Sequence, residues 1–114
     1  MNQRSVGTLT EARASEFLKR NGLRILARNY HCKSGELDII AADTDGTIVF
    51  VEVKYRRTDA YGLPEEAVSA GKQLVLQRAA MWYLKEQRLS LESAMRFDVI
   101  AMDSEEIRWY QNAF

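Results

Sequence analysis

The chain has 114 residues, of which 46% are hydrophobic and 28% are charged. These proportions are typical of a folded protein with one modest core, so we expect a single domain over residues 1–114. Lys and Arg together number 16, as do Asp and Glu, so the net charge is zero. That balance argues against strong binding to nucleic acid through bulk charge, although a local basic surface remains compatible with it.

A single cysteine, Cys32, excludes an intrachain disulfide. The N-terminal residues lack an apolar stretch of signal-peptide length, and no apolar run approaches the roughly 20 residues that span a membrane. We therefore expect a cytoplasmic protein.

The first half of the chain predicts one helix and two strands. A helix is expected over 9–21, with Gly22 in the usual position after a helix end. Strands over 23–30 and 36–42 follow, separated by a turn at 33–35. The expected inward side of the helix carries Leu9, Ala14, Phe17 and Leu18.

The second half begins with a hairpin turn at 43–46 and a strongly β-branched strand over 47–55. Residues 56–65 contain the only proline and predict a loop. A long helix over 69–88 and strands over 95–102 and 107–110 complete the order α-β-β-β-α-β-β. This order fits an α/β or α+β sandwich, with helices packed on a sheet.

Charged side chains interrupt two of the most apolar predicted strands. Asp38 lies in GELDII, and Glu52 and Lys54 lie in IVFVEVKY. Because side chains alternate along a strand, Glu52 and Lys54 share a face, and the intervening hairpin brings Asp38 beside them. Two carboxylates, with the Val53 carbonyl as a further ligand, suit Mg²⁺ or Mn²⁺ beside a phosphodiester. A lysine there can orient water or stabilise charge developing on phosphorus.

The alternative is an ion pair between Glu52 and Lys54 on a solvated strand, which contributes little. The apolar flanks of both carboxylates weigh against it, since charges on partly buried strands are costly. The same alternation places Leu37 and Ile39 together on the face opposite Asp38.

Two helical residues point toward the same place. Glu11 lies at the edge of the inward side of the first helix, although an acid near a helix N-terminus is also favoured by the dipole. Lys72 begins the inward stripe of the second helix and is a candidate phosphate contact, with snorkelling to water as the alternative. Gln73 is adjacent to Lys72 and is a weaker candidate for the same contact.

Further basic and aromatic side chains flank this set. Lys33, Arg56 and Arg57 are candidates for positioning phosphates, with solvated loop ends as the alternative. His31 has no second ligand at metal-site spacing and is interpreted as a surface residue at a strand end. Core packing or a subunit interface is favoured over base stacking for Trp82, Tyr83 and Trp109, whereas Tyr55 and Tyr61 are better placed for stacking.

The sequence resembles the UPF0102 (YraN-like) family, which is similar in turn to restriction-endonuclease-like PD-(D/E)xK nucleases and, most of all, to archaeal Holliday junction resolvases. The blocks that carry the resemblance are Glu11-x-x-Ala14, Ile25-Leu26-x-Arg28-Asn29-Tyr30, Gly35-Glu36-Leu37-Asp38, Val51-Glu52-Val53-Lys54-x-Arg56, Lys72 and Arg96-Phe97-Asp98-Val99. Leu37 departs from the motif's proline, Thr10 from a common glycine, and His31-Cys32 from a frequent arginine.

The resemblance implies an α/β fold with a mixed central sheet flanked by helices. It implies Mg²⁺- or Mn²⁺-dependent hydrolysis of DNA, possibly branched, by a homodimer, with Asp38 and Glu52 holding the metal. Lys54 would act on water or the transition state, Glu11 would complete the site through a metal-bound water, and Lys72 would contact phosphate. The alternatives are a nucleic-acid-binding module of the same fold with weak or no catalysis, and an interaction domain with neither property.

Overall fold

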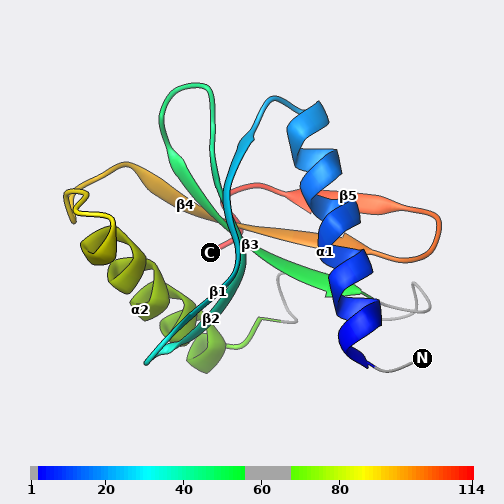
Figure 1. The fold of residues 1–114 in the computed structure, drawn as a ribbon, viewed down its shortest axis with the longest axis horizontal. Helices are drawn as coiled ribbons and strands as arrows, with labels where there is room; N and C mark the ends of the chain where they lie inside the picture. The colour runs from blue at the N-terminus through cyan, green and yellow to red at the C-terminus, as the bar shows by residue number, and fades with distance from the viewer. Residues whose placement is uncertain (1–2, 56–67) are drawn as a thin grey trace.

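A five-stranded sheet separates two helices in the computed structural model, which describes residues 3–55 and 68–114, with side chains from residue 9 onward (Figure 1). The elements are α1 (Gln3–Arg20), β1 (Arg24–Cys32), β2 (Gly35–Ala42), β3 (Ile48–Tyr55), α2 (Ala70–Glu86), β4 (Met95–Met102) and β5 (Ile107–Tyr110). The expected order α-β-β-β-α-β-β and the mixed sheet are confirmed. The loop expected at 56–65 lies outside the described residues.

The strands lie in sequence order, β1-β2-β3-β4-β5. Only β3 and β4 are parallel, and α2 lies in the connection between them. The other neighbours are antiparallel, as short hairpin connections require. This arrangement leaves β3 in the middle of the sheet, with both of its faces covered.

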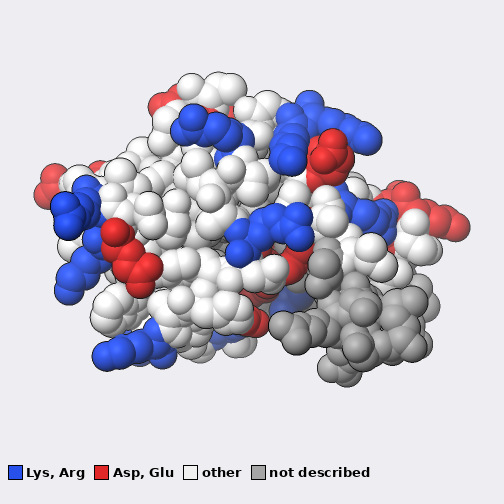
Figure 2. Space-filling model, viewed as in Figure 1, with Lys and Arg blue, Asp and Glu red and all other residues white. Residues whose placement is uncertain are grey.

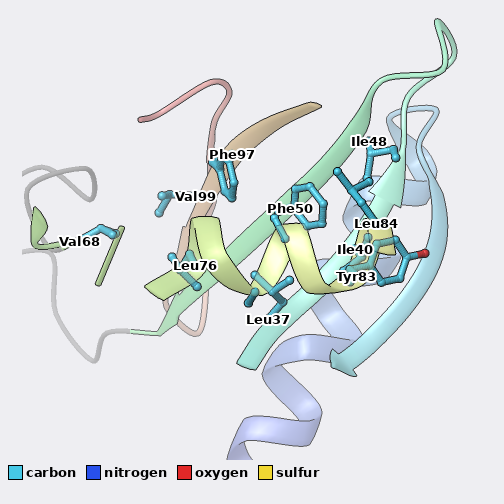
Figure 3. Packing of buried hydrophobic residues seen from close by; sticks show 12 residues of the cluster. Leu37, Ile40, Ile48, Phe50, Val68, Leu76, Tyr83, Leu84, Phe97 and Val99 are labelled. Carbon is cyan, nitrogen blue, oxygen red and sulfur yellow. The ribbon is translucent and has the colours of Figure 1, made fainter. Parts of the chain in front are cut away.

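Each helix buries one face of the sheet. Ala14 and Leu18 of α1 pack with Val49 and Val51. On the other face, α2 covers the cluster drawn in Figure 3, where Leu76 and Leu84 pack with Phe50. Because β3 is apolar on both faces for most of its length, a charged residue further along it meets a low-dielectric environment.

The first helix starts earlier than predicted and buries the predicted Ala14 and Leu18 but not Leu9. It begins at Gln3 instead of Leu9, and Leu9 is 61% exposed. Gly7 weakens a helix locally, but extending a helix that is already nucleated costs little per residue. The C-terminal end follows the prediction: Gly22 has φ 92°, and the Leu23 N–H donates to the Leu18 carbonyl at 3.0 Å.

A local irregularity in β1 changes which residues share a face. The β1–β2 register shifts between Ile25 and Ala27, and Asn29, with φ 53°, interrupts the regular strand backbone between the in-register pairs Arg28–Ile39 and Tyr30–Leu37. Leu37 packs on the α2 side, whereas Ile39 packs on the α1 side. The prediction that these two side chains share a face is therefore wrong. Regular alternation fails where the ladder itself is irregular.

The C-terminal residues are held to β4 by one buried carboxylate. Asp98 is fully buried and accepts hydrogen bonds from the Arg96 Nε (3.1 Å), the Trp109 indole (2.9 Å) and the Asn112 N–H (2.9 Å). Arg96 also donates to Asp43 at 2.7 Å. Trp109 thus has a structural role, as the core-packing interpretation predicts.

Within residues 3–55 and 68–114, no helix is long and apolar enough to cross a membrane.

Candidate active site

The ladder between β2 and β3 ends where the acidic residues begin. The last pair of that ladder is Ile39 opposite Val51. One residue beyond, the Val53 N–H donates to the Asp38 carboxylate (Oδ2) at 2.8 Å. The Asp38 carboxylate thus pairs with a backbone N–H that could otherwise pair with a neighbouring strand. This contact holds Asp38 against the backbone next to Glu52.

Glu52 is buried with an incomplete set of partners. The residue is 8% exposed, and its Oε2 has no hydrogen-bond partner among the residues that the structure describes. The Lys72 Nζ is the counter-ion, 3.6 Å from that oxygen and therefore beyond good hydrogen-bond length. An unsatisfied, buried carboxylate oxygen is costly, which makes it a natural position for a ligand.

The environment raises the pKa of the Glu52 carboxyl to about 8. Burial is the main cause, and a hydrogen bond to Asp38 and that residue's negative charge add to the rise. The ammonium groups of Lys72 and Lys54 oppose it. Two carboxylates in contact repel each other, so a divalent cation bound between them would stabilise this pair.

Lys72 reaches the pair from the start of α2. Ser69 caps this helix, and its Oγ accepts the Lys72 N–H at 3.1 Å. The Lys72 side chain remains 39% exposed, so its ammonium lies between Glu52 and solvent. The stripe predicted behind it is confirmed, since Leu76, Ala79, Ala80 and Tyr83 are all buried.

Glu11 approaches from α1 and is also buried. Burial raises the pKa of the Glu11 carboxyl, and the negative charge of Asp38 raises it further, while Arg28 opposes the shift. The side-chain amide of Asn29, with its nitrogen turned toward α1, donates to both Glu11 oxygens and lies 2.6 Å from Oε2. Glu16 is exposed, as helix phasing predicts.

The residues present fit a divalent cation held by two carboxylates. In the described part of the chain, no group of three or more His, Cys, Asp or Glu side chains is arranged to hold a metal ion. Glu11 therefore lies beside the pair without forming a compact triad with it. Mg²⁺ is commonly held by one or two carboxylates, with water and substrate phosphate completing its shell. The unpartnered Oε2 of Glu52 supplies an open ligand position for such an ion.

Residues 10–102 match the family model described as "Uncharacterised protein family UPF0102". The chain belongs to UPF0102. It is 46% identical over 114 residues to the UPF0102 protein of Lachnoclostridium phytofermentans, covering all of this chain and 96% of that one. It is 51% identical over 96 residues to the UPF0102 protein of Syntrophus aciditrophicus, covering 84% and 74% of the two chains.

The solved structures that match this UPF0102 chain are more distant in sequence. The crystal structure of SSO0001 has a TM-score of 0.50 at 18% identity and covers 94% of this chain and 50% of that one. A repair endonuclease from Pyrococcus abyssi has a TM-score of 0.45 at 17% identity, with 92% and 41% covered. This chain thus spans half or less of the length of these structures. The likeness to SSO0001 shows that this chain shares the fold of that structure over most of its length.

The other predicted site residues have varied placements. Lys54 lies close enough to Glu52 to affect its pKa, whereas Lys33 is exposed at the β1–β2 turn. The Gln73 amide donates to the Val68 carbonyl at 3.0 Å and so ties α2 to the chain before it. Arg56, Arg57 and Tyr61 lie outside the described residues.

Two interpretations of less central residues are confirmed. His31 is exposed and lies 3.3 Å from the Glu36 carboxylate. Tyr83 is buried against Phe50 and Tyr30. On the face shown in Figure 2, Lys and Arg form several separate groups interspersed with Asp and Glu. Basic side chains on that face are therefore local features, in keeping with the neutral net charge.

Sequence reasoning missed Asn29 as a site residue. Its one available signal is an asparagine inside a strand pattern, since asparagine is enriched in left-handed backbone conformations.

Proposed function

We propose that this UPF0102 protein is a metal-dependent endonuclease that hydrolyses phosphodiester bonds in DNA. The observation that carries the proposal is the buried Glu52 carboxylate, which has one unpartnered oxygen, lies against Asp38 and faces Lys72. These charged side chains lie together where the β2–β3 ladder ends. Their burial destabilises the fold, so a purely structural role does not explain them.

Each residue has a role that follows from its chemistry. Asp38 and Glu52, with the Val53 carbonyl, would hold Mg²⁺ or Mn²⁺. A bound divalent ion polarises phosphoryl oxygens and acidifies water. Lys54 would orient the attacking water and offset the charge that develops on phosphorus. Water adds to phosphorus, one ester P–O bond breaks, and the leaving oxygen gains a proton.

The remaining candidates would bind substrate. Lys72 is half exposed and can leave Glu52 to contact a phosphate when a cation takes over its charge-balancing role. Lys33, Arg56, Arg57 and Gln73 would position the nucleic acid backbone. A homodimer would combine two such sets of basic residues, which would offset the neutral charge of each chain.

The test is single-turnover cleavage of duplex, flap and four-way DNA and of the matching RNA, with Mg²⁺, Mn²⁺ or EDTA. Asp38→Asn and Glu52→Gln preserve side-chain shape and are each expected to lower cleavage about 100-fold or more, because charge on the metal ligands is lost. Glu16→Gln is the matched control, since Glu16 is an exposed acid of α1. Cleavage that survives both substitutions, or that proceeds fully in EDTA, would refute the proposal.

The same samples separate the alternatives. A binding module without catalysis would bind DNA in a salt-sensitive manner and leave it intact with either metal. An interaction domain would do neither.

A further inference from the structure

We propose that Asn29 is a positioning residue that holds the Glu11 carboxylate in the active site. The inference rests on the proposed function for its catalytic part. Its structural part, a contact between the two side chains, can be tested without any cleavage assay.

Asn29 has a left-handed backbone conformation within β1. Its φ of 53° lies in the left-handed region, which asparagine and glycine tolerate best. Asn29 falls between the pairs Arg28–Ile39 and Tyr30–Leu37, at the level of Asp38. A residue with regular strand dihedral angles at this position would continue the alternation of β1, and its side chain would point in another direction.

The Asn29 side chain contacts the Glu11 carboxylate. With its nitrogen toward α1, the Asn29 amide donates to both oxygens of Glu11. Two hydrogen bonds from one planar group fix the rotation of a carboxylate as well as its position. Glu11 is 8% exposed, so water has little access to replace these donors.

Together the two observations connect three elements of the site. Asn29 belongs to β1, Glu11 to α1, and Asp38 to the strand β2 that lies opposite the irregularity. The Asp38 charge acts on Glu11, so the two acids are neighbours. The left-handed residue of β1 thereby sets the distance between the helical acid and the strand acid.

The first experiment compares Asn29→Gly with the matched control Asn112→Gly. Both asparagines are exposed and left-handed, with φ of 53° and 52°, so glycine preserves each backbone conformation. Asn29→Gly is expected to lower single-turnover cleavage about 10- to 100-fold, as loss of groups that orient metal-site ligands commonly does. The DNA concentration for half-maximal cleavage should stay unchanged, and Asn112→Gly should cleave like the wild type.

The second experiment asks whether Asn29 acts through Glu11. In a Glu11→Gln background, Asn29→Gly is expected to lower the residual cleavage less than about 2-fold. A purely structural contribution would instead add in full. Unchanged cleavage by Asn29→Gly, or an equal loss in both backgrounds, would overturn the inference.

The third experiment uses thermal melting at one fixed pH and needs no activity. Asn29→Asp replaces the donor with a second carboxylate and is expected to lower Tm by several degrees. Adding Glu11→Gln restores an amide opposite a carboxylate and should recover most of that loss. If the two shifts simply add, the contact is absent. Recovery of Tm in a protein whose wild type does not cleave would refute the proposed function, and with it the catalytic part, while establishing the contact.

Discussion

At the scale of single residues, the main feature is a carboxyl group in an environment that disfavours its charge. Glu52 follows Phe50 on the α2 side of the sheet, and the ammonium groups of Lys72, at 3.6 Å, and of Lys54 offset its charge only in part. Proteins usually avoid such groups unless they serve chemistry. Because the pKa of the Glu52 carboxyl is about 8, the stability of the protein should depend on pH.

We expect Glu52→Gln to stabilise the protein relative to wild type as pH rises, measured by melting in EDTA. The folded state retains the Glu52 proton up to about pH 8, whereas an unfolded carboxyl loses it near 4.5. Wild-type stability therefore falls across this window, and the glutamine variant lacks that loss. The difference should be near zero at pH 4.5 and reach a few kcal/mol at pH 8. A pH-independent difference would contradict this account.

At the scale of elements, two polar contacts hold strands where the backbone ladder does not. Asp38 takes the Val53 N–H at the point where β2 and β3 stop pairing. Asp98 connects β4 to Trp109 of β5 and to the backbone of Asn112. The first contact shapes the site, and the second holds the C-terminal residues against Phe97, whose carbonyl accepts the Ala113 N–H at 2.7 Å.

Asp98→Asn should therefore destabilise the fold strongly. The change leaves the Arg96 guanidinium without its buried partner, and breaking such a pair typically costs about 3–5 kcal/mol. Denaturant unfolding measures the loss, with the exposed acid variant Glu92→Gln as the control. A cost near that of the control would show that Asp43 alone neutralises Arg96.

At the scale of the whole molecule, neutral net charge limits how the protein could bind the DNA substrate proposed for it. The candidate phosphate contacts are few: Lys33, Lys54, Arg56, Arg57 and Lys72. On the face in Figure 2, basic groups stand apart from one another. Affinity must then come from local contacts near the site and not from a general positive field.

The salt dependence of DNA binding tests this view. Each neutralised phosphate contributes about −0.9 to the slope of log K against log salt, so five contacts predict a slope no steeper than about −4 to −5 per chain. Lys72→Ala should make it shallower by about one. A slope near −8 would show a larger basic surface than the candidate residues provide.

Hydrophobic periodicity and the residues typical of turns are enough to predict most of the fold. The bounds of β4 and β5, the cap at Ser69 and the glycine at the end of α1 all follow from local patterns. Helix phasing was enough to bring Lys72 toward Glu52, while the shared face of Glu52 and Lys54 stays a prediction from alternation. The start of α1 and the faces of Leu37 and Ile39 do not follow, because they depend on helix extension and on an irregular ladder.

The sequence by itself determined the order of the elements and the chemical groups of the site, since both depend on residue type and short-range spacing. Only the tertiary structure decided which hydrogen bonds and charge partners those groups have. Among the described residues it left one Glu52 oxygen without a hydrogen bond, it paired the Val53 N–H with Asp38, and it turned Asn29 toward Glu11. These outcomes arise where β1, β2, β3 and both helices meet, and no local pattern encodes a contact among residues so far apart in the chain.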